Sequence, residues 1–101
     1  MIVIRNTFEL KFGKAKEALA LLKEAIVIQK RVLGSADFSN RILTDVTGRN
    51  YIVVLELTVP SLAAFESLAP KLFANAEWQA HYQKIVPLVH SGHREVYNVV
   101  E

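Results

Sequence analysis

The feature that most restricts the fold is the run from Tyr51 to Val59, which is rich in β-branched and aromatic residues and is apolar on both faces except at Glu56 and Thr58. A strand of this composition suits the middle of a sheet, where both of its faces are covered. The weakly alternating stretch 41–46 precedes it, and the loop 47–50 between them contains a glycine. The two stretches therefore predict a β-hairpin.

The N-terminal stretch 2–12 predicts another strand, because its even positions are mainly apolar and its odd positions are largely polar. Asn6 interrupts the apolar face. The commoner explanation of such a residue is a buried amide satisfied by neighbouring backbone groups. The alternative is a polar group that faces a ligand pocket.

Two amphipathic helical segments complete the pattern. In the first, Lys16-Glu17, Lys23-Glu24 and Lys30-Arg31 recur on one side, the other side is apolar, and Gly34 ends the helix. The second is expected to begin at an N-cap, Ser61, to break at Pro70, to restart at Asn75 and to end before Pro87. Gly92 is then expected to lead from a turn into the last strand.

The order βαββαβ predicts a single α+β domain over residues 1–101, with a ferredoxin-like, four-stranded antiparallel sheet and both helices on one face. The strands are expected near residues 2–12, 38–46, 50–59 and 93–100. The other face would carry Ile52 and Val54, and 51% of the chain is hydrophobic. We therefore expect a second copy to cover this face, which gives a homodimer, a dimeric α+β barrel.

Composition excludes several kinds of function. Twelve basic residues against ten acidic ones give a net charge of +2 without any basic cluster, so nucleic-acid binding is not expected. The chain has no cysteine and no apolar run long enough for a membrane span, and a cytoplasmic protein is expected. His90 and His93 form an H-x-x-H pair, but in a turn they do not predict a metal site, and no cofactor is expected.

The stretch 75–100 carries the densest chemistry, because Trp78, His81, Tyr82 and Ile85 share one helical stripe. It resembles the end of the NIPSNAP-like and antibiotic-biosynthesis-monooxygenase-like dimeric α+β barrels, in which a helix with an E-W-Q sequence, a proline and a strand close the chain. The resemblance implies that Asn6 corresponds to a pocket-lining asparagine of the first strand and His81 to a histidine of the last helix. Trp78 stands later than the tryptophan of haem-degrading members, so no haem is implied.

Two functions are compatible with these residues. The first is binding of a small apolar or aromatic molecule, with Phe8, Phe65, Trp78 and Tyr82 as its contacts. The alternative, implied by the resemblance, is a cofactor-independent monooxygenase or isomerase acting on an aromatic or polyketide-like substrate, with Asn6 and His81 as catalytic groups. Core packing is the commoner explanation of side chains in such positions. What discriminates is whether Asn6 and His81 converge on one cavity.

Overall fold

The computed structural model describes residues 1–100. It consists of four strands, three α-helices and one 3₁₀ turn, in the order β1 (Ile2–Leu10), α1 (Ala15–Leu33), β2 (Ser39–Thr44), β3 (Ile52–Val59), α2 (Leu62–Phe73), α3 (Ala76–Ile85), η1 (Val86–Leu88) and β4 (Val89–Asn98). None of these helices is both long enough and apolar enough to cross a membrane.

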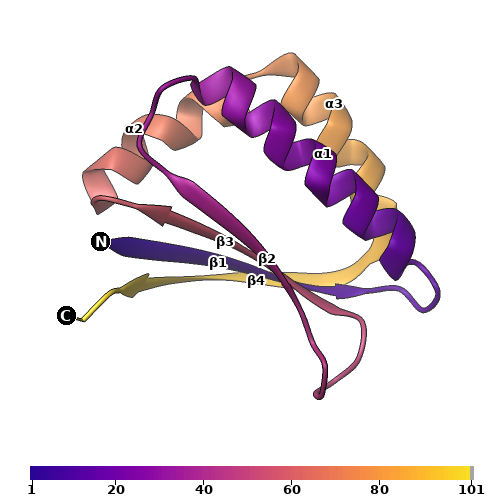
Figure 1. The fold of residues 1–101 in the computed structure, drawn as a ribbon. Helices are drawn as coiled ribbons and strands as arrows, with labels where there is room; N and C mark the ends of the chain where they lie inside the picture. The colour runs from indigo at the N-terminus through magenta and orange to yellow at the C-terminus, as the bar shows by residue number, and fades with distance from the viewer. Residues whose placement is uncertain (101) are drawn as a thin grey trace.

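The strands form one antiparallel sheet in the order β2-β3-β1-β4. All helices lie on one face of it, with α1 and α3 side by side and α2 near the end where the chain begins and ends (Figure 1). This is the ferredoxin-like α+β arrangement, so the predicted fold is confirmed. Three of the four strands lie within two residues of their expected bounds.

The predicted helix ends are satisfied by the expected side chains. Ser61 Oγ accepts a hydrogen bond from the backbone N–H of Ala64 at 3.1 Å, and Asn75 Oδ1 accepts one from Trp78 at 2.9 Å. Each cap satisfies an N–H group that has no partner within its own helix. Gly34 follows α1 with φ of 62°, a conformation that glycine adopts without strain.

The core lies between the sheet and the helices, where the apolar side of α1 meets the sheet and α3. Its fully buried members include Leu10, Ala18, Leu22, Val53 and Ile85. Burying a side chain of the size of leucine or isoleucine stabilises the fold by about 1.5 to 3 kcal/mol. This packing fixes the helix layer above the middle of the sheet.

Pro70 does not break α2, which continues to Phe73. A proline inside a helix removes one N–H group and crowds the preceding turn. The last turn nevertheless buries Leu72, which is 5% exposed, and the helix ends when Ala74 donates its N–H to the Pro70 carbonyl. The break between α2 and α3 therefore falls at residues 74–75 instead of at the proline.

The last strand begins at Val89, four residues earlier than predicted, so His90, Gly92 and His93 lie in β4 and not in a turn. Gly92 pairs with Phe8, and a Cβ atom at Gly92 would lie 3.0 Å from the Phe8 ring. A glycine is needed at this position because the Phe8 ring packs over the strand. The sequence alone does not distinguish a glycine required by packing from a glycine in a turn.

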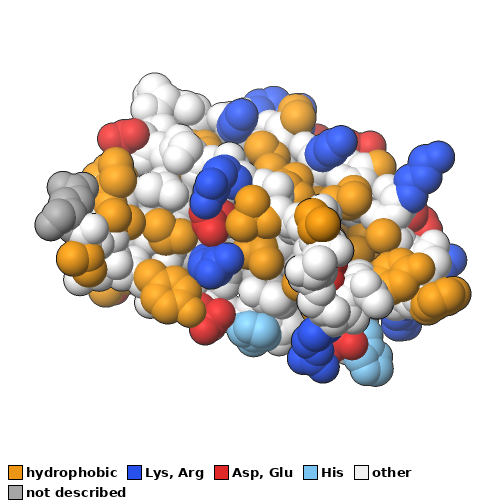
Figure 2. All heavy atoms as spheres, turned by 60° about the horizontal axis from the view of Figure 1, so that its bottom comes forward, with side chains coloured by type: hydrophobic (Ala, Val, Ile, Leu, Met, Phe, Trp, Pro, Cys, Tyr) orange, Lys and Arg blue, Asp and Glu red, His pale blue; other side chains and the backbone are white. Residues whose placement is uncertain are grey.

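The face of the sheet opposite the helices is uncovered in the single chain. Glu56 lies at its centre and is only 7% exposed, because Arg5 and Arg41 flank it on the neighbouring strands. The carboxylate is 3.2 Å from Arg5 Nε and 2.5 Å from an Arg41 Nη. Figure 2 shows basic and acidic side chains near the middle of this face, with hydrophobic side chains on either side.

Candidate functional site

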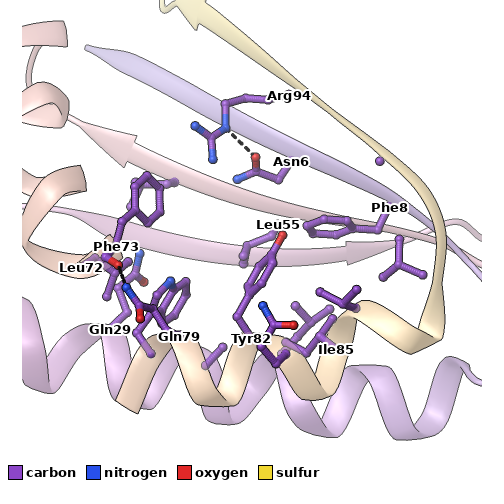
Figure 3. Close-up of a pocket in the computed structure, with 18 of the residues that line it drawn as sticks. Asn6, Phe8, Gln29, Leu55, Leu72, Phe73, Gln79, Tyr82, Ile85 and Arg94 are labelled. Carbon is purple, nitrogen blue, oxygen red and sulfur yellow. Dashed lines mark hydrogen bonds between the residues drawn. The ribbon is translucent and has the colours of Figure 1, made fainter. Parts of the chain in front are cut away.

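A cavity of about 720 Å³ separates the sheet from part of the helix layer. The four strands of the sheet form its roof, and α1, α2 and α3 form its floor and sides (Figure 3). Helices α2 and α3 contribute Leu72, Phe73 and Trp78 to its lining.

Most of the cavity wall is apolar. Four aromatic side chains line it, from three different elements: Phe8, Phe73, Trp78 and Tyr82. The rings of Trp78 and Tyr82 lie 6.3 Å apart between centroids, and the ring of Tyr82 reaches from α3 toward the sheet (Figure 3). Leu22, Leu55, Leu57 and Leu72 fill the spaces between them.

Two polar pairs interrupt this apolar wall. Arg94 of β4 donates from Nε to Asn6 Oδ1 of β1 at 2.8 Å. Asn40 of β2 donates from Nδ2 to Gln29 Oε1 of α1 at 2.7 Å. Gln29 is 6% exposed, and Asn40 Oδ1 is buried without a hydrogen-bond partner within residues 1–100. The cavity thus has hydrogen-bonding groups on two sides and apolar surface between them, the usual character of a small-molecule site.

The predicted residues fall into two groups. The cavity brings together Asn6, Phe8, Trp78 and Tyr82. Phe65 does not line it but lies beside the site, with its ring centroid 5.9 Å from Arg94 Cζ. Strand β1 and helix α3 therefore place these four side chains around one cavity.

His81 does not converge with Asn6. It is 5% exposed, and its Nε2 lies 2.7 Å from the Leu21 carbonyl oxygen, to which it donates. Its Nδ1 is 3.9 Å from Glu24 of the same helix, α1. The expectation that His81 borders the cavity is thus wrong, and its ring joins α3 to α1.

Helix geometry explains why one stripe separates. Successive residues are rotated by about 100°, so that His81 lies about 100° around α3 from Tyr82, while Trp78 and Ile85 lie between them. The helix packs along α1, and its Ile85 joins the core cluster with Leu10 and Val53 of the sheet. Tyr82 at one edge of the stripe therefore lines the cavity, and His81 at the other edge contacts α1.

The sequence did not single out Arg94, Gln29 or Asn40. Arg94 was placed in the expected last strand, but nothing in the pattern gave the register that sets it opposite Asn6. A scan of β4 for alternate positions would have put Gly92, Arg94 and Val96 on one face. The contact between Gln29 and Asn40 depends on how α1 lies over the sheet.

The two strand histidines do not form a metal site. His90 is exposed at the point where the register between β1 and β4 shifts, and His93 Nε2 lies 3.6 Å from Glu95 on the uncovered face. Within residues 1–100, no group of three His, Cys, Asp or Glu side chains is close enough to hold a metal ion.

No protein-family model matches the chain, and no curated protein matches its sequence. Solved structures do match. A NIPSNAP domain protein from Burkholderia xenovorans superposes with a TM-score of 0.86 at 20% identity, over 99% of this chain and 95% of that one. The chain has the NIPSNAP fold.

Two further structures extend this comparison. A NIPSNAP family protein from Agrobacterium tumefaciens superposes with a TM-score of 0.84 at 24% identity, over 99% of this chain and 93% of that one. An antibiotic biosynthesis monooxygenase superposes over the full length of both chains, with a lower TM-score of 0.75 at 14% identity. The fold resemblance noted in the sequence is thereby confirmed, and at these identities it concerns the fold alone.

Proposed function

We propose that this NIPSNAP-fold protein binds a small, largely apolar molecule in the cavity between its sheet and its helices. The observation that carries the proposal is the cavity itself, about 720 Å³ in volume and lined by four aromatic side chains. Ligand sites in proteins typically measure about 300 to 1,000 Å³ and combine apolar walls with a few oriented polar groups.

Packing supports the same proposal. Interiors of proteins are close-packed, and side chains that border an empty space lose dispersion contacts on that side. Phe8, Leu55 and Trp78 are all partly buried at the edge of the core and face this space. A molecule with an apolar body would complete their packing.

A binding role is favoured over the monooxygenase or isomerase alternative. That alternative needs a base beside Asn6, and His81 faces α1 instead. Within residues 1–100 the cavity has no carboxylate side chain that could replace it, because its polar side chains are amides, Tyr82, His93 and Arg94. The His93 ring is directed to the opposite face, where it meets Glu95.

A neutral fluorescent probe tests the proposal. N-phenyl-1-naphthylamine should bind saturably, one molecule per chain, with a rise in its own emission. Leu57→Trp places a larger ring on the cavity wall and should weaken binding strongly, whereas Leu62→Trp, at an exposed position of α2 outside the cavity, should not. Absence of saturable binding, or equal weakening in both variants, would contradict the proposal.

We also propose that two copies pack through their uncovered sheet faces. Val3, Leu43 and Val54 are half-buried on this face, and Tyr97 is 44% exposed there, so apolar surface surrounds the central charges. Sedimentation equilibrium should give twice the chain mass of 11.3 kDa, and Val54→Arg should give monomer. A wild-type monomer at micromolar concentration would contradict this.

A further inference from the structure

Arg94 is held in one orientation at the mouth of the cavity by three neighbours. Its Nε donates to Asn6 Oδ1 at 2.8 Å, and its Cζ lies 5.9 Å from the ring centroids of both Phe65 and Phe73. A guanidinium over an aromatic face is attracted by the negative potential of the ring. Strand β1 and helix α2 therefore position a side chain that belongs to β4.

The hydrogen bond also fixes the Asn6 amide. A guanidinium only donates, so the Asn6 atom that faces it must be the oxygen, and Nδ2 is left as a donor. Figure 3 shows the two side chains together at one end of the cavity. No hydrogen bond within residues 1–100 uses the Arg94 Nη atoms or Asn6 Nδ2. The pair thus presents donors without acceptors.

The other arginines of the chain differ from Arg94. Arg5, Arg31, Arg41 and Arg49 each have a glutamate oxygen within 2.5 to 4.0 Å. Within residues 1–100, Arg94 is the one arginine that lacks such a partner, and it is also the one that lines the cavity. No Asp, Glu or Lys side chain of these residues lines the cavity, so the charge of its wall is positive.

We propose that the ligand of this cavity is an organic anion, a carboxylate attached to an apolar body. This inference rests on the proposed function, since it assigns the chemistry of the molecule that the cavity binds. The carboxylate would accept hydrogen bonds from Arg94 Nη and Asn6 Nδ2, and its body would lie among the aromatic side chains. Arginine suits this role because its planar donors match the two oxygens of a carboxylate.

Matched acids and alcohols test the proposal. The probes are octanoate against 1-octanol and 1-naphthoate against 1-naphthylmethanol, titrated at neutral pH and followed by emission of Trp78, the single tryptophan, which lines the cavity. Each acid should bind roughly tenfold or more tightly than its alcohol, because a charge-assisted hydrogen bond contributes more than a neutral one. The difference should narrow at high salt, which screens the exposed guanidinium.

Variants then assign the preference to these two residues. Arg94→Gln should bring the acid to the affinity of the alcohol and leave the alcohol unchanged. Asn6→Asp, nearly identical in shape, should do the same by supplying Arg94 with an internal carboxylate. Arg49→Gln, in the loop between β2 and β3 and 4.0 Å from Glu9, lies outside the cavity and should preserve the preference.

The outcomes separate the two proposals. Equal binding of acids and alcohols to the wild type, or an acid preference that survives Arg94→Gln, would overturn the anionic ligand and leave the apolar cavity site intact. Loss of alcohol binding in Arg94→Gln would also overturn it, since Arg94 would then shape the cavity. If no acid or alcohol binds, both proposals fail.

Discussion

Arginine side chains on the two faces of the sheet have different partners. On the uncovered face, Arg5 and Arg41 converge on one buried carboxylate, Glu56. On the helix face, Arg94 finds an amide oxygen and two aromatic rings, and within residues 1–100 it has no carboxylate partner. The arginines at the centre of the first face are paired with a carboxylate of the chain, whereas Arg94 on the second face is paired with none within residues 1–100.

Two adjacent residues of strand β1, Arg5 and Asn6, lie on opposite faces of the sheet. Arg5 faces the glutamate on the uncovered side, and Asn6 orients Arg94 on the helix side, because successive residues of a strand point to opposite faces. The difference between the two faces is therefore that Arg5 has a carboxylate partner and Arg94 has none within residues 1–100. The following predictions test that difference, beginning with the largest effect.

Replacing single side chains of β1 by alanine should show the largest difference in stability between the two faces. Ile4 is 1% exposed on the helix face, and Ile4→Ala should lower the free energy of unfolding by about 2 to 5 kcal/mol, through lost burial and a new cavity. Its neighbour Val3 is half-buried on the uncovered face, so Val3→Ala should cost about 1 kcal/mol or less in the single chain. Urea unfolding measures both.

Protein concentration sharpens this comparison. If a second copy covers the uncovered face, the cost of Val3→Ala should grow as concentration is raised, while that of Ile4→Ala relative to wild type stays the same. If both variants lose the same free energy of unfolding at all concentrations, Ile4 and Val3 do not differ in burial.

His81 tests whether the helix face contains more than one functional group. His81→Ala removes the bond to the Leu21 carbonyl and should lower the free energy of unfolding by about 1 to 3 kcal/mol. Binding of the neutral probe at saturating folded protein should be unchanged, because His81 lies outside the cavity. His81→Gln, which can donate to the same carbonyl, should recover part of the stability.

The opposite result would restore the role expected from the sequence. If His81→Ala melts like the wild type but no longer binds the probe, the imidazole acts at the cavity and not between α1 and α3. Calorimetric melts and probe titrations of the same samples decide between these outcomes.

On the uncovered face, Glu56→Gln removes the carboxylate that pairs with Arg5 and Arg41 and should lower the free energy of unfolding. We expect a loss of about 1 to 2 kcal/mol, less than for a fully buried pair, because the Arg5 and Arg41 side chains are 38% and 67% exposed. Glu66→Gln, at an exposed position of α2, is the matched control and should cost nothing measurable. An equal effect of both changes would show that the ion pairs do not stabilise the fold.

Local patterns predicted the fold well because each element carries its own periodicity and caps. The alternation of β1, the amphipathic face of α1 and the caps Ser61 and Asn75 all depend on neighbours along the chain. The predicted bounds were wrong at a proline and a glycine, residue types that occur both at the ends of helices and strands and inside them. Pro70 and Gly92 resemble breaks in sequence, but burial of Leu72 and the ring of Phe8 keep them inside a helix and a strand.

The site was predicted only in part, because its residues meet through register and packing. Asn6, Phe8, Trp78 and Tyr82 were found from their faces on single elements. The contact of Asn6 with Arg94 needs the antiparallel register of β1 and β4, and the separation of His81 needs the position of α1. No pattern within one element contains either fact.

The smallest expected effect is a titration on the uncovered face. Tyr97 donates its hydroxyl to Glu95 Oε2 at 2.6 Å, and this hydrogen bond, followed by burial and the charge of Glu95, raises the pKa of Tyr97, while Arg5 lowers it by less. Glu95→Gln removes the charge and should shift the pKa of Tyr97 down toward the ordinary value of about 10. Because the pKa of Tyr97 is raised in the folded protein, its hydrogen bond stabilises the fold fully at pH values below the pKa of Tyr97 in the unfolded chain. This stabilisation is lost as the pH rises through the pKa of Tyr97 in the folded protein.

Absorbance titration of the wild type and Glu95→Gln, each corrected with its Tyr97→Phe counterpart, isolates this tyrosine from Tyr51 and Tyr82. An unchanged Tyr97 curve in Glu95→Gln would mean that water, and not Glu95, accepts the hydrogen bond from the Tyr97 hydroxyl. The polar groups at the rim of this face would then differ from Arg5 and Arg41 at its centre, which have a partner within the chain.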